Sequence, residues 1–397
     1  MRRREIGTRN DYRHRWWGVV AVVALALGCS TQGASRSDSR ASSSAGGGGS
    51  AGGGSGGAAG GAGHDGGDGG AVGGNGNGGG AGVDSPVAGS GGTTTVVVTR
   101  CNALPTSCTG LSHTCGPTGD ADCCESDLVT GGTYLRDNFD GLDATVRTFC
   151  LDKYETTVAR FRRFVAAYPG SRPAAGAGKN PNNPNDPGWD PSWDAKLPAT
   201  QANLDRNLAN LSCSPFRFWT LSSTGQYESS PMNCVDWFTF YAFCAWDGGW
   251  LPTRVEWDYA ARGGAQQRTF PWSVPPSDST LDSDHATYEC SGDAGDANCS
   301  SILGVLPVGS KPSGDGLFGQ SDLIGNVTEW LQDWHLSTDA QIPCVECADL
   351  GTAGKWRELR GGHAASSPQN LAIQADATSY VPEQMWAYLG GRCARAP

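Results

Sequence analysis

The stretch that decides the fold spans residues 249–264 and reads GWLPTRVEWDYAARGG. Thr253 is followed three positions later by Glu256, the spacing of a capping box, in which each side chain satisfies a backbone N–H that the first helical turn leaves unpaired. The spacing therefore predicts a helix that is capped at Thr253 and runs through Ala261. The Gly-Gly pair at the end of the stretch ends this helix, because glycine readily adopts the left-handed backbone that closes helices.

Two more helices are predicted upstream. Residues 235–246 are almost wholly apolar, and Trp237, Phe240, Tyr241 and Cys244 recur at helical spacing, which is typical of a buried helix. Further upstream, Thr156 or Thr157 can cap an amphipathic helix that Pro169 and Gly170 end. The apolar face of this helix would carry Val158, Phe161, Phe164 and Val165, and the polar face Arg160, Arg162 and Arg163.

Three motifs follow the opening stretch in order. They are GNVTEW at 325–330, Arg360-Gly361-Gly362, and GRCA at 391–394. With the opening stretch they resemble the formylglycine-generating enzyme family, also called sulfatase-modifying-factor domains, from about Gly131 to the C-terminus. The resemblance implies an α+β domain with the C-type-lectin-like fold of that family and little regular secondary structure. It also implies a long-range disulfide between Cys244 and Cys393.

The family's active enzymes oxidise a substrate cysteine to formylglycine with a copper ion held by two cysteines beyond the Arg-Gly-Gly motif. Soft thiolates are the ligands that select Cu(I). Aligned without gaps, those two positions fall on Ser366 and Leu371, and no cysteine lies between Gly362 and Cys393. His363 replaces the motif serine, and Thr328 replaces a motif tryptophan. The sequence therefore predicts that copper is not a cofactor.

The resemblance also implies a structural calcium site. Its ligands would be the side chains of Asp322 and Glu329 and the backbone carbonyls of Gly325 and Val327. Hard oxygen ligands of this kind suit calcium. The alternative is that the two acids are solvated or act as caps.

Residues 1–29 are interpreted as a bacterial signal peptide. Arginines precede an apolar run from Trp16 to Gly28 that is too short for a mature membrane span, and LALGC at 25–29 is similar to a lipobox. Cys29 would then carry a lipid that anchors the protein at the bacterial envelope, at the outer membrane or cell surface. Ordinary signal cleavage beside a cysteine is the alternative.

Residues 30–98 form a tether of Gly, Ser, Ala and Asn with almost nothing to bury. Such a chain is predicted to stay flexible, with a root-mean-square reach of about 45 Å. A cysteine-rich lead segment, 99–130, precedes the main domain, 131–397. Contact with the membrane is expected through the lipid anchor alone.

Disulfides are the default for the cysteines of an exported protein. Cys29 is one of fifteen, which leaves an even number. Five of them crowd the lead segment, with Cys150 as a possible sixth partner; the five are Cys101, Cys108, Cys115, Cys123 and Cys124. Cys290 and Cys299 could close a loop, and the CxxC of Cys344 and Cys347 favours a local structural disulfide over zinc or redox chemistry.

The remaining signals limit the function. His285, His335 and His363 show no ligand spacing, so ordinary core or surface roles are expected. A net charge of −11 disfavours binding to nucleic acid and suits calcium, sugars or cationic partners.

Two functions remain open. One is an oxidase of this superfamily that acts on a sulfatase-type or other protein substrate through a divergent site. The other is a non-catalytic, lectin-like module that binds a protein, peptide or glycan in the envelope.

Overall fold

The computed structural model describes residues 98–397 apart from several short segments. Those segments are 103, 140, 210–212, 214–216, 222–224, 291–303, 336–341, 352–353, 372 and 374–378. The predicted signal peptide, Cys29, almost all of the tether and Cys299 lie outside the described residues. The described residues all belong to one compact unit, 88–397. None of their helices has the length and apolar character needed to cross a bilayer.

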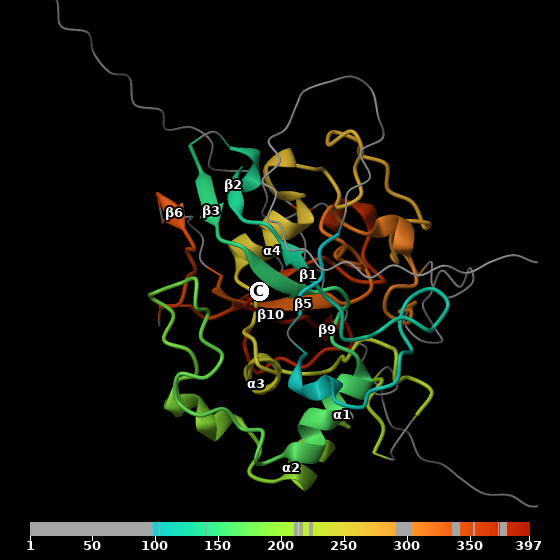
Figure 1. The fold of residues 1–397 in the computed structure, drawn as a ribbon. Helices are drawn as coiled ribbons and strands as arrows, with labels where there is room; N and C mark the ends of the chain where they lie inside the picture. Colours follow the sequence, from blue (N-terminus) through green and yellow to red (C-terminus); the bar gives the residue numbers. More distant parts are fainter. Residues whose placement is uncertain are drawn as a thin grey trace, which may run out of the picture. The chain divides into compact units, whose positions relative to one another are not determined.

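The described strands form three small sheets (Figure 1). The first has the order β1–β4–β10 and is antiparallel; its strands are β1 (Ser126–Val129), β4 (Phe149–Asp152) and β10 (Ala394–Arg395). The second has the order β2–β3–β6; its strands are β2 (Gly132–Leu135), β3 (Asp143–Val146) and β6 (Cys344–Val345). The third has the order β8–β7–β5–β9; its strands are β8 (Ser379–Tyr380), β7 (Arg357–Arg360), β5 (Thr328–Trp334) and β9 (Leu389–Gly390). Because β1 belongs to the lead segment and β10 to the C-terminus, the first sheet joins both ends of the folded unit.

Four α-helices are described, each with a polar cap at its N-terminus. They are α1 (Val158–Ala167), α2 (Gln201–Leu208), α3 (Trp237–Trp246) and α4 (Arg254–Ala261), capped by Thr157, Thr200, Asp236 and Thr253. Short 3-10 helices make up most of the remaining regular structure: Thr106–Cys108, Arg136–Asn138, Pro191–Lys196, Gly264–Gln266, Pro312–Gly314 and Pro368–Asn370. The expected α+β class with little regular structure is confirmed.

The capping box that the sequence predicted is present. Thr253 Oγ1 accepts the Glu256 N–H (3.2 Å), and Glu256 Oε2 accepts the Thr253 N–H (2.9 Å). Gly263 follows α4 with φ +62°, the left-handed conformation expected of a helix stop.

Several tryptophans pack in the core. Trp189, Trp237, Trp257 and Trp330 are among the largest fully buried side chains. Around α1 and α3, aromatic rings stack and meet edge to face, as where the ring centroids of Phe161 and Phe243 lie 5.0 Å apart. Such contacts add to the burial of apolar area that stabilises a core.

The polar face predicted for α1 is wrong at one residue. Arg160 is fully buried, whereas Arg162 is half-buried and Arg163 is exposed. Helical spacing places Arg160 one turn before Phe164, at the border of the apolar face, and Ser107 of the lead segment covers that side of the helix. Because its guanidinium binds Asp247, which lies 87 positions away, as well as Asp152, the sequence around α1 could not reveal its burial.

Disulfides close the lead segment and cross the domain. The described pairs are Cys101–Cys150, Cys108–Cys124, Cys115–Cys123, Cys213–Cys234, Cys244–Cys393 and Cys344–Cys347. The six cysteines expected in the lead set therefore pair among themselves, and the implied pair Cys244–Cys393 is present with its Cα atoms 5.4 Å apart. Cys290 is also disulfide-bonded.

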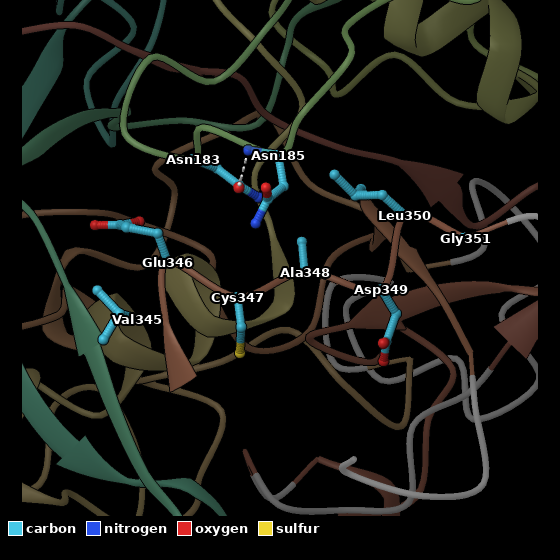
Figure 2. A pocket seen from close by; sticks show the side chains of 9 residues that line it. All are labelled: Asn183, Asn185, Val345, Glu346, Cys347, Ala348, Asp349, Leu350 and Gly351. Carbon is cyan, nitrogen blue, oxygen red and sulfur yellow. Dashed lines mark hydrogen bonds between the residues drawn. The ribbon is translucent and has the colours of Figure 1, made fainter. Parts of the chain in front are cut away.

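The loop after β6 borders a cavity of about 350 Å³ (Figure 2). Residues 345–351 form one wall, and Asn183 and Asn185 belong to the other. The Cys344–Cys347 disulfide, which spans three residues, constrains the first wall.

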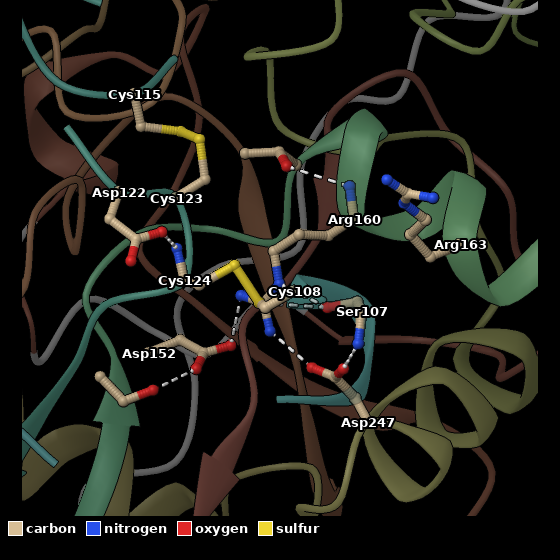
Figure 3. Close-up of a disulfide and its surroundings, with 12 residues drawn as sticks. Ser107, Cys108, Cys115, Asp122, Cys123, Cys124, Asp152, Arg160, Arg163 and Asp247 are labelled. Carbon is tan, nitrogen blue, oxygen red and sulfur yellow. Dashed lines mark hydrogen bonds and ion pairs between the residues drawn. A yellow bond between two sulfur atoms is a disulfide. The ribbon is translucent and has the colours of Figure 1, made fainter. Parts of the chain in front are cut away.

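A fully buried ion network connects the lead segment, α1, α3 and the C-terminal strand. Figure 3 shows its part around Arg160, Asp152 and Asp247. Arg160 Nη1 lies 2.9 Å from Asp152 Oδ2, and Arg160 Nη2 lies 2.5 Å from Asp247 Oδ2. Arg395 Nη2 lies 2.5 Å from Asp152 Oδ1, and the N–H of Ser107 donates to Asp247 Oδ1 (2.7 Å). Burial alone would raise the pKa of Asp152, but the guanidiniums of Arg160 and Arg395 together lower it to about 2.

Replacing Arg160 with methionine should destabilise the protein strongly. Arg160→Met keeps much of the side-chain volume but leaves the carboxylates of Asp152 and Asp247 buried with less compensating charge. We expect a loss of about 3–5 kcal/mol in the free energy of unfolding, measured by urea titration. Arg163→Met on the exposed face of the same helix is the control, with an expected change within about 0.5 kcal/mol. Equal effects from the two variants would contradict the structural role of the network.

The same network predicts the response of stability to acid. The pKa of Asp152 is about 2 in the folded protein and about 3.9 in the unfolded chain. The ionised carboxylate therefore stabilises the fold fully above about pH 3.9, and this stabilisation is lost as the pH falls through about 2. In Arg160→Met, Asp152 stays buried with only Arg395 as its ion-pair partner, so its pKa should rise above about 2 and the variant should lose less stability than the natural protein as the pH falls. The difference in stability between the natural protein and Arg160→Met should therefore shrink as the pH falls from 7 to about 3, and a difference that grew in acid would contradict this assignment.

Candidate functional site

The loop that leads into β5 brings Asp322 and Glu329 close to a third carboxylate. Glu155, which follows β4, is fully buried and accepts hydrogen bonds from Asn326 Nδ2 (2.6 Å) and from the N–H of Val327 (3.0 Å). Asp322 Oδ2 accepts the N–H of Gly309 (2.6 Å). The two loop residues Asp322 and Asn326 have φ values of +57° and +55°, a conformation that asparagine and aspartate tolerate better than most residues.

Glu329 on β5 is held by protein donors on both oxygens. Arg392 Nε lies 2.9 Å from Oε1 and 3.0 Å from Oε2, and Arg392 Nη2 lies 2.8 Å from Oε1. Trp257 Nε1, from α4, donates to Oε2 (3.0 Å). Because Arg392 belongs to the GRCA motif and Trp257 to the opening stretch, this carboxylate ties three of the four motifs together.

Negative charge exceeds positive charge in this cluster of Glu155, Asp322, Glu329 and Arg392. Burial raises the pKa of Glu155 well above its usual range, and the nearby carboxylates of Asp322 and Glu329 raise it further. Burial also raises the pKa of Asp322 to about 6. Protons or a cation can offset such charge, and the oxygen donors fit a hard divalent cation in type and in charge.

The geometry fits the expected calcium ligands only in part. The Glu329 carboxylate already accepts hydrogen bonds from Arg392 and Trp257. The Asp322 carboxylate accepts a hydrogen bond from the N–H of Gly309, so fewer protein donors compete with a cation for its oxygens. Among the described residues, no group of three or more His, Cys, Asp or Glu side chains converges in the arrangement of a metal site. The sequence did not single out Glu155, because it lies far from the loop in the chain and shows no motif spacing.

Ser366 and Leu371, the positions implied for copper, both lie against Gly362. A Cβ atom added to Gly362 would come within 2.6 Å of Leu371 Cδ2 and 3.3 Å of Ser366 Oγ. Leu371 is fully buried among apolar side chains that include Trp257 and Leu323. Ser366 Oγ accepts the N–H of His363 (3.0 Å). One hydrocarbon and one hydroxyl offer no soft ligand for Cu(I).

His363 lies against an aromatic cluster beside these two positions. Its ring stacks on Tyr388 with centroids 4.2 Å apart and meets Trp386 edge to face at 5.1 Å. Burial lowers the pKa of His363 to about 4, so the imidazole is neutral at pH 7. Its Nδ1 accepts the N–H of Ala365 (3.2 Å), which leaves the proton on Nε2. Thr328 Oγ1 donates to the carbonyl of Gly362 (3.0 Å), so it binds the backbone of the same motif.

The other two histidines bind separate carboxylates. His285 Nδ1 lies 2.7 Å from Asp282 Oδ1, and His335 Nδ1 lies 3.1 Å from Glu358 Oε1. His285 also stacks on Trp272. Each histidine of the main domain thus has its own polar or aromatic partners.

No free thiol remains among the described cysteines. All thirteen of them are disulfide-bonded. A thiolate is the form of cysteine that binds copper or attacks a substrate. The described part of the chain therefore presents no thiolate for either role.

Comparisons with known proteins identify the family and include both active and inactive relatives. The sulfatase-modifying factor enzyme 1-like domain (FGE-sulfatase) matches residues 116–397, beginning inside the cysteine-rich lead segment. The formylglycine-generating enzyme of Mus musculus is 34% identical over 182 residues, which cover 44% of this chain and 46% of the relative. The inactive C-alpha-formylglycine-generating enzyme 2 of Bos taurus is 30% identical over 166 residues, which cover 41% of this chain and 50% of the relative.

Among solved structures, PvdO from Pseudomonas aeruginosa is similar with a TM-score of 0.46 and 20% identity, over 70% of this chain and 96% of that one. The matched segment spans about half the length of the two curated relatives. Because the family match extends over most of the chain, this protein belongs to the sulfatase-modifying-factor family, which includes the formylglycine-generating enzymes.

Proposed function

We propose that this chain is a non-catalytic, envelope-anchored member of the family whose folded domain binds a protein, peptide or glycan. The observation that carries the proposal is the side-chain chemistry beside Gly362. Ser366 and Leu371 stand at the positions implied for the two copper cysteines, and Leu371 is packed into the core. These two side chains offer no soft ligand to the Cu(I) ion that copper-dependent oxidation of a substrate cysteine needs.

The disulfides support the same conclusion. Since every described cysteine is already oxidised, no neighbouring thiol can replace the missing pair without reduction of the fold. His363 does not supply an equivalent, because a neutral imidazole beside a serine is a weaker and harder ligand set than two thiolates. Its Nε2–H remains a hydrogen-bond donor.

A half-buried aromatic surface beside Gly362 supports a binding role. His363, Tyr380 and Trp386 are all partly exposed, and the rings of Tyr380 and Trp386 meet edge to face at 5.8 Å. Rings of this kind offer apolar faces and polar edges to peptide side chains or to sugars. This surface lies where the family's active enzymes carry their chemistry.

Anchoring through Cys29 completes the proposal, because a lipidated cysteine followed by a flexible tether would hold the domain near a membrane surface. The protein produced in bacteria should partition with the detergent phase, and Cys29→Ser should move it to the aqueous phase. Equal partitioning of the two forms would remove the lipid anchor from the account.

The decisive test for catalysis uses the full chain, Cu(I), oxygen and a cysteine-containing sulfatase peptide. We expect neither oxygen consumption above background nor formylglycine in the peptide by mass spectrometry, because the copper ligands are missing. An active formylglycine-generating enzyme is the positive control. Formylglycine produced by the natural chain would instead establish an oxidase with a divergent site.

The double variant Ser366→Cys/Leu371→Cys provides a matched gain-of-binding control. Because both side chains lie against Gly362, two thiols at these positions should bind Cu(I) tightly, whereas the natural chain should not. The measurement is an anaerobic titration against a Cu(I) chelator. Tight, stoichiometric binding by the natural chain would contradict the proposal.

Calcium binding at Asp322, the carbonyls of Gly325 and Val327, and Glu329 is a second part of the proposal. The excess negative charge supports it, and we add Glu155 to the set that a cation would neutralise. Calcium that binds only the folded state adds about 2.7 kcal/mol of stability at one hundred times its dissociation constant. The melting temperature should therefore rise when calcium is added to chelated protein.

Asp322→Asn should abolish most of this calcium-dependent rise. Asp322 is a better test than Glu329, whose replacement would also break its pairing with Arg392. Asp333→Asn is the control, since Asp333 is a buried carboxylate bonded to the backbone of Arg254 and Asp349 and lies outside the cluster. An unchanged melting temperature after chelation and re-addition of calcium would withdraw the calcium site.

The calcium effect should also depend on pH. Without a cation, the pKa of Asp322 in the folded protein is raised to about 6, above its value of about 3.9 in the unfolded chain. Protonation of Asp322 therefore stabilises the folded state fully below about pH 3.9, and this stabilisation is lost as the pH rises through about 6. Calcium would offset that loss. The rise in melting temperature should therefore be larger at pH 7.5 than at pH 5, and a larger rise at pH 5 would contradict the role of Asp322.

A further inference from the structure

The cavity of about 350 Å³ beside the CxxC loop has the size of a small-ligand site, for which volumes of about 300–1,000 Å³ are usual. Its lining comprises Asn183, Asn185, Val345, Glu346, Cys347, Ala348, Asp349, Leu350 and Gly351. In Figure 2 the side chains of the two asparagines face the opposite loop at Cys347 and Ala348. The site is separate from the residues around Gly362, since none of those lines it.

Hydrogen bonds within the chain hold the asparagine wall in place. Asn183 is 3% exposed, and its Oδ1 accepts the N–H of Asn185 (2.9 Å). The adjoining Asp186 accepts the N–H of Asn180 (2.7 Å), the N–H of Gly188 (2.8 Å) and Gln332 Nε2 (2.9 Å). These turns fix the backbone that carries both asparagine amides.

The opposite wall is also held in place. The Cys344–Cys347 disulfide closes the turn, in which Glu346 has φ +50°, a conformation that few residues other than glycine adopt. The N–H of Glu346 donates to Thr145 O (2.9 Å), and Glu346 Oε1 accepts the N–H of Arg147. Two rigid walls reduce the entropy that binding would cost.

The negative charge of the residues that line the cavity favours a cationic ligand. Among the nine lining residues, Glu346 and Asp349 are acidic and none is Lys, Arg or His. Glu346 is buried and contributes its charge, whereas Asp349 is the partly exposed carboxylate that a ligand could contact. Anionic ligands would meet like charge, and the lining has no aromatic ring on which a sugar could stack. A cationic group with N–H donors is complementary to the carboxylates, and an aliphatic stem would pack on Val345, Ala348 and Leu350.

Neighbouring apolar surface indicates that the cation belongs to a protein. Ile342 and Val345, beside the cavity, are 63% and 54% exposed. A protein surface could cover both side chains, whereas a free diamine would leave them in water. We propose that this cavity binds a lysine or arginine side chain of a protein partner. This inference rests on the proposed binding function and names the class of its partner.

The test titrates the full chain with short capped peptides that carry lysine, arginine or norleucine at one position. Binding is followed through the NMR signals of the asparagine side-chain amides. The lysine or arginine peptide should bind at least tenfold more tightly than the norleucine peptide, and the signals of Asn183 and Asn185 should shift. Equal binding of the norleucine peptide, or tighter binding of a glutamate peptide, would overturn the proposal.

Asp349→Asn should weaken binding of the basic peptide at least fivefold, with Asp284→Asn, an exposed carboxylate outside the lining, as the control. Cys344→Ser/Cys347→Ser should also weaken binding, because the loop would lose its constraint.

A free diamine that binds as tightly as the peptide would overturn the assignment to a protein side chain. The copper and oxygen assay reports separately on catalysis, so a failure here would remove this partner class and leave the non-catalytic assignment standing.

Discussion

The buried carboxylate of Asp152 is the constraint on which the rest of the structure depends. It receives the guanidiniums of Arg160 from α1 and Arg395 from β10, and Arg160 extends the network to Asp247 at the end of α3. Removing charges from water is costly unless each is paired, so this arrangement tolerates few alternatives. The network fixes β10, and the preceding residues Arg392 and Cys393 thereby reach Glu329 and Cys244.

Local sequence signals predicted the helices because caps and stops act within one or two turns. Thr253 with Glu256 defined α4, and Thr157 was one of the two caps considered for α1. Contacts between distant residues were beyond such signals. Arg160 looked like a surface residue because Asp247 lies 87 positions away, and Glu155 joins the loop of Asp322 and Glu329 only through the fold. The cysteines of the lead segment were identified as a set, but only folding determines which pairs form.

The candidate site combines two kinds of chemistry. Around Glu329 the chain has carboxylates and a guanidinium whose charges suit a proton or a hard cation. Around Gly362 it has Leu371, Ser366 and a neutral His363, which suit packing and hydrogen bonding. The resemblance predicted where to look for both, because each lies in a motif. What those positions can do was decided by their side chains, since hydrocarbon and hydroxyl groups cannot replace thiolates as ligands of Cu(I).

The central claim is that the described part of this chain has the family's scaffold without free thiols that could hold copper. Counting free thiols tests it most directly. The full chain is denatured without reductant and treated with an alkylating reagent, and modified cysteines are located by mass spectrometry. The account predicts no alkylated cysteine among the described residues and an intact Cys244–Cys393 bond. A pair of alkylated cysteines in the folded domain would contradict the account, because two free thiols could then bind Cu(I).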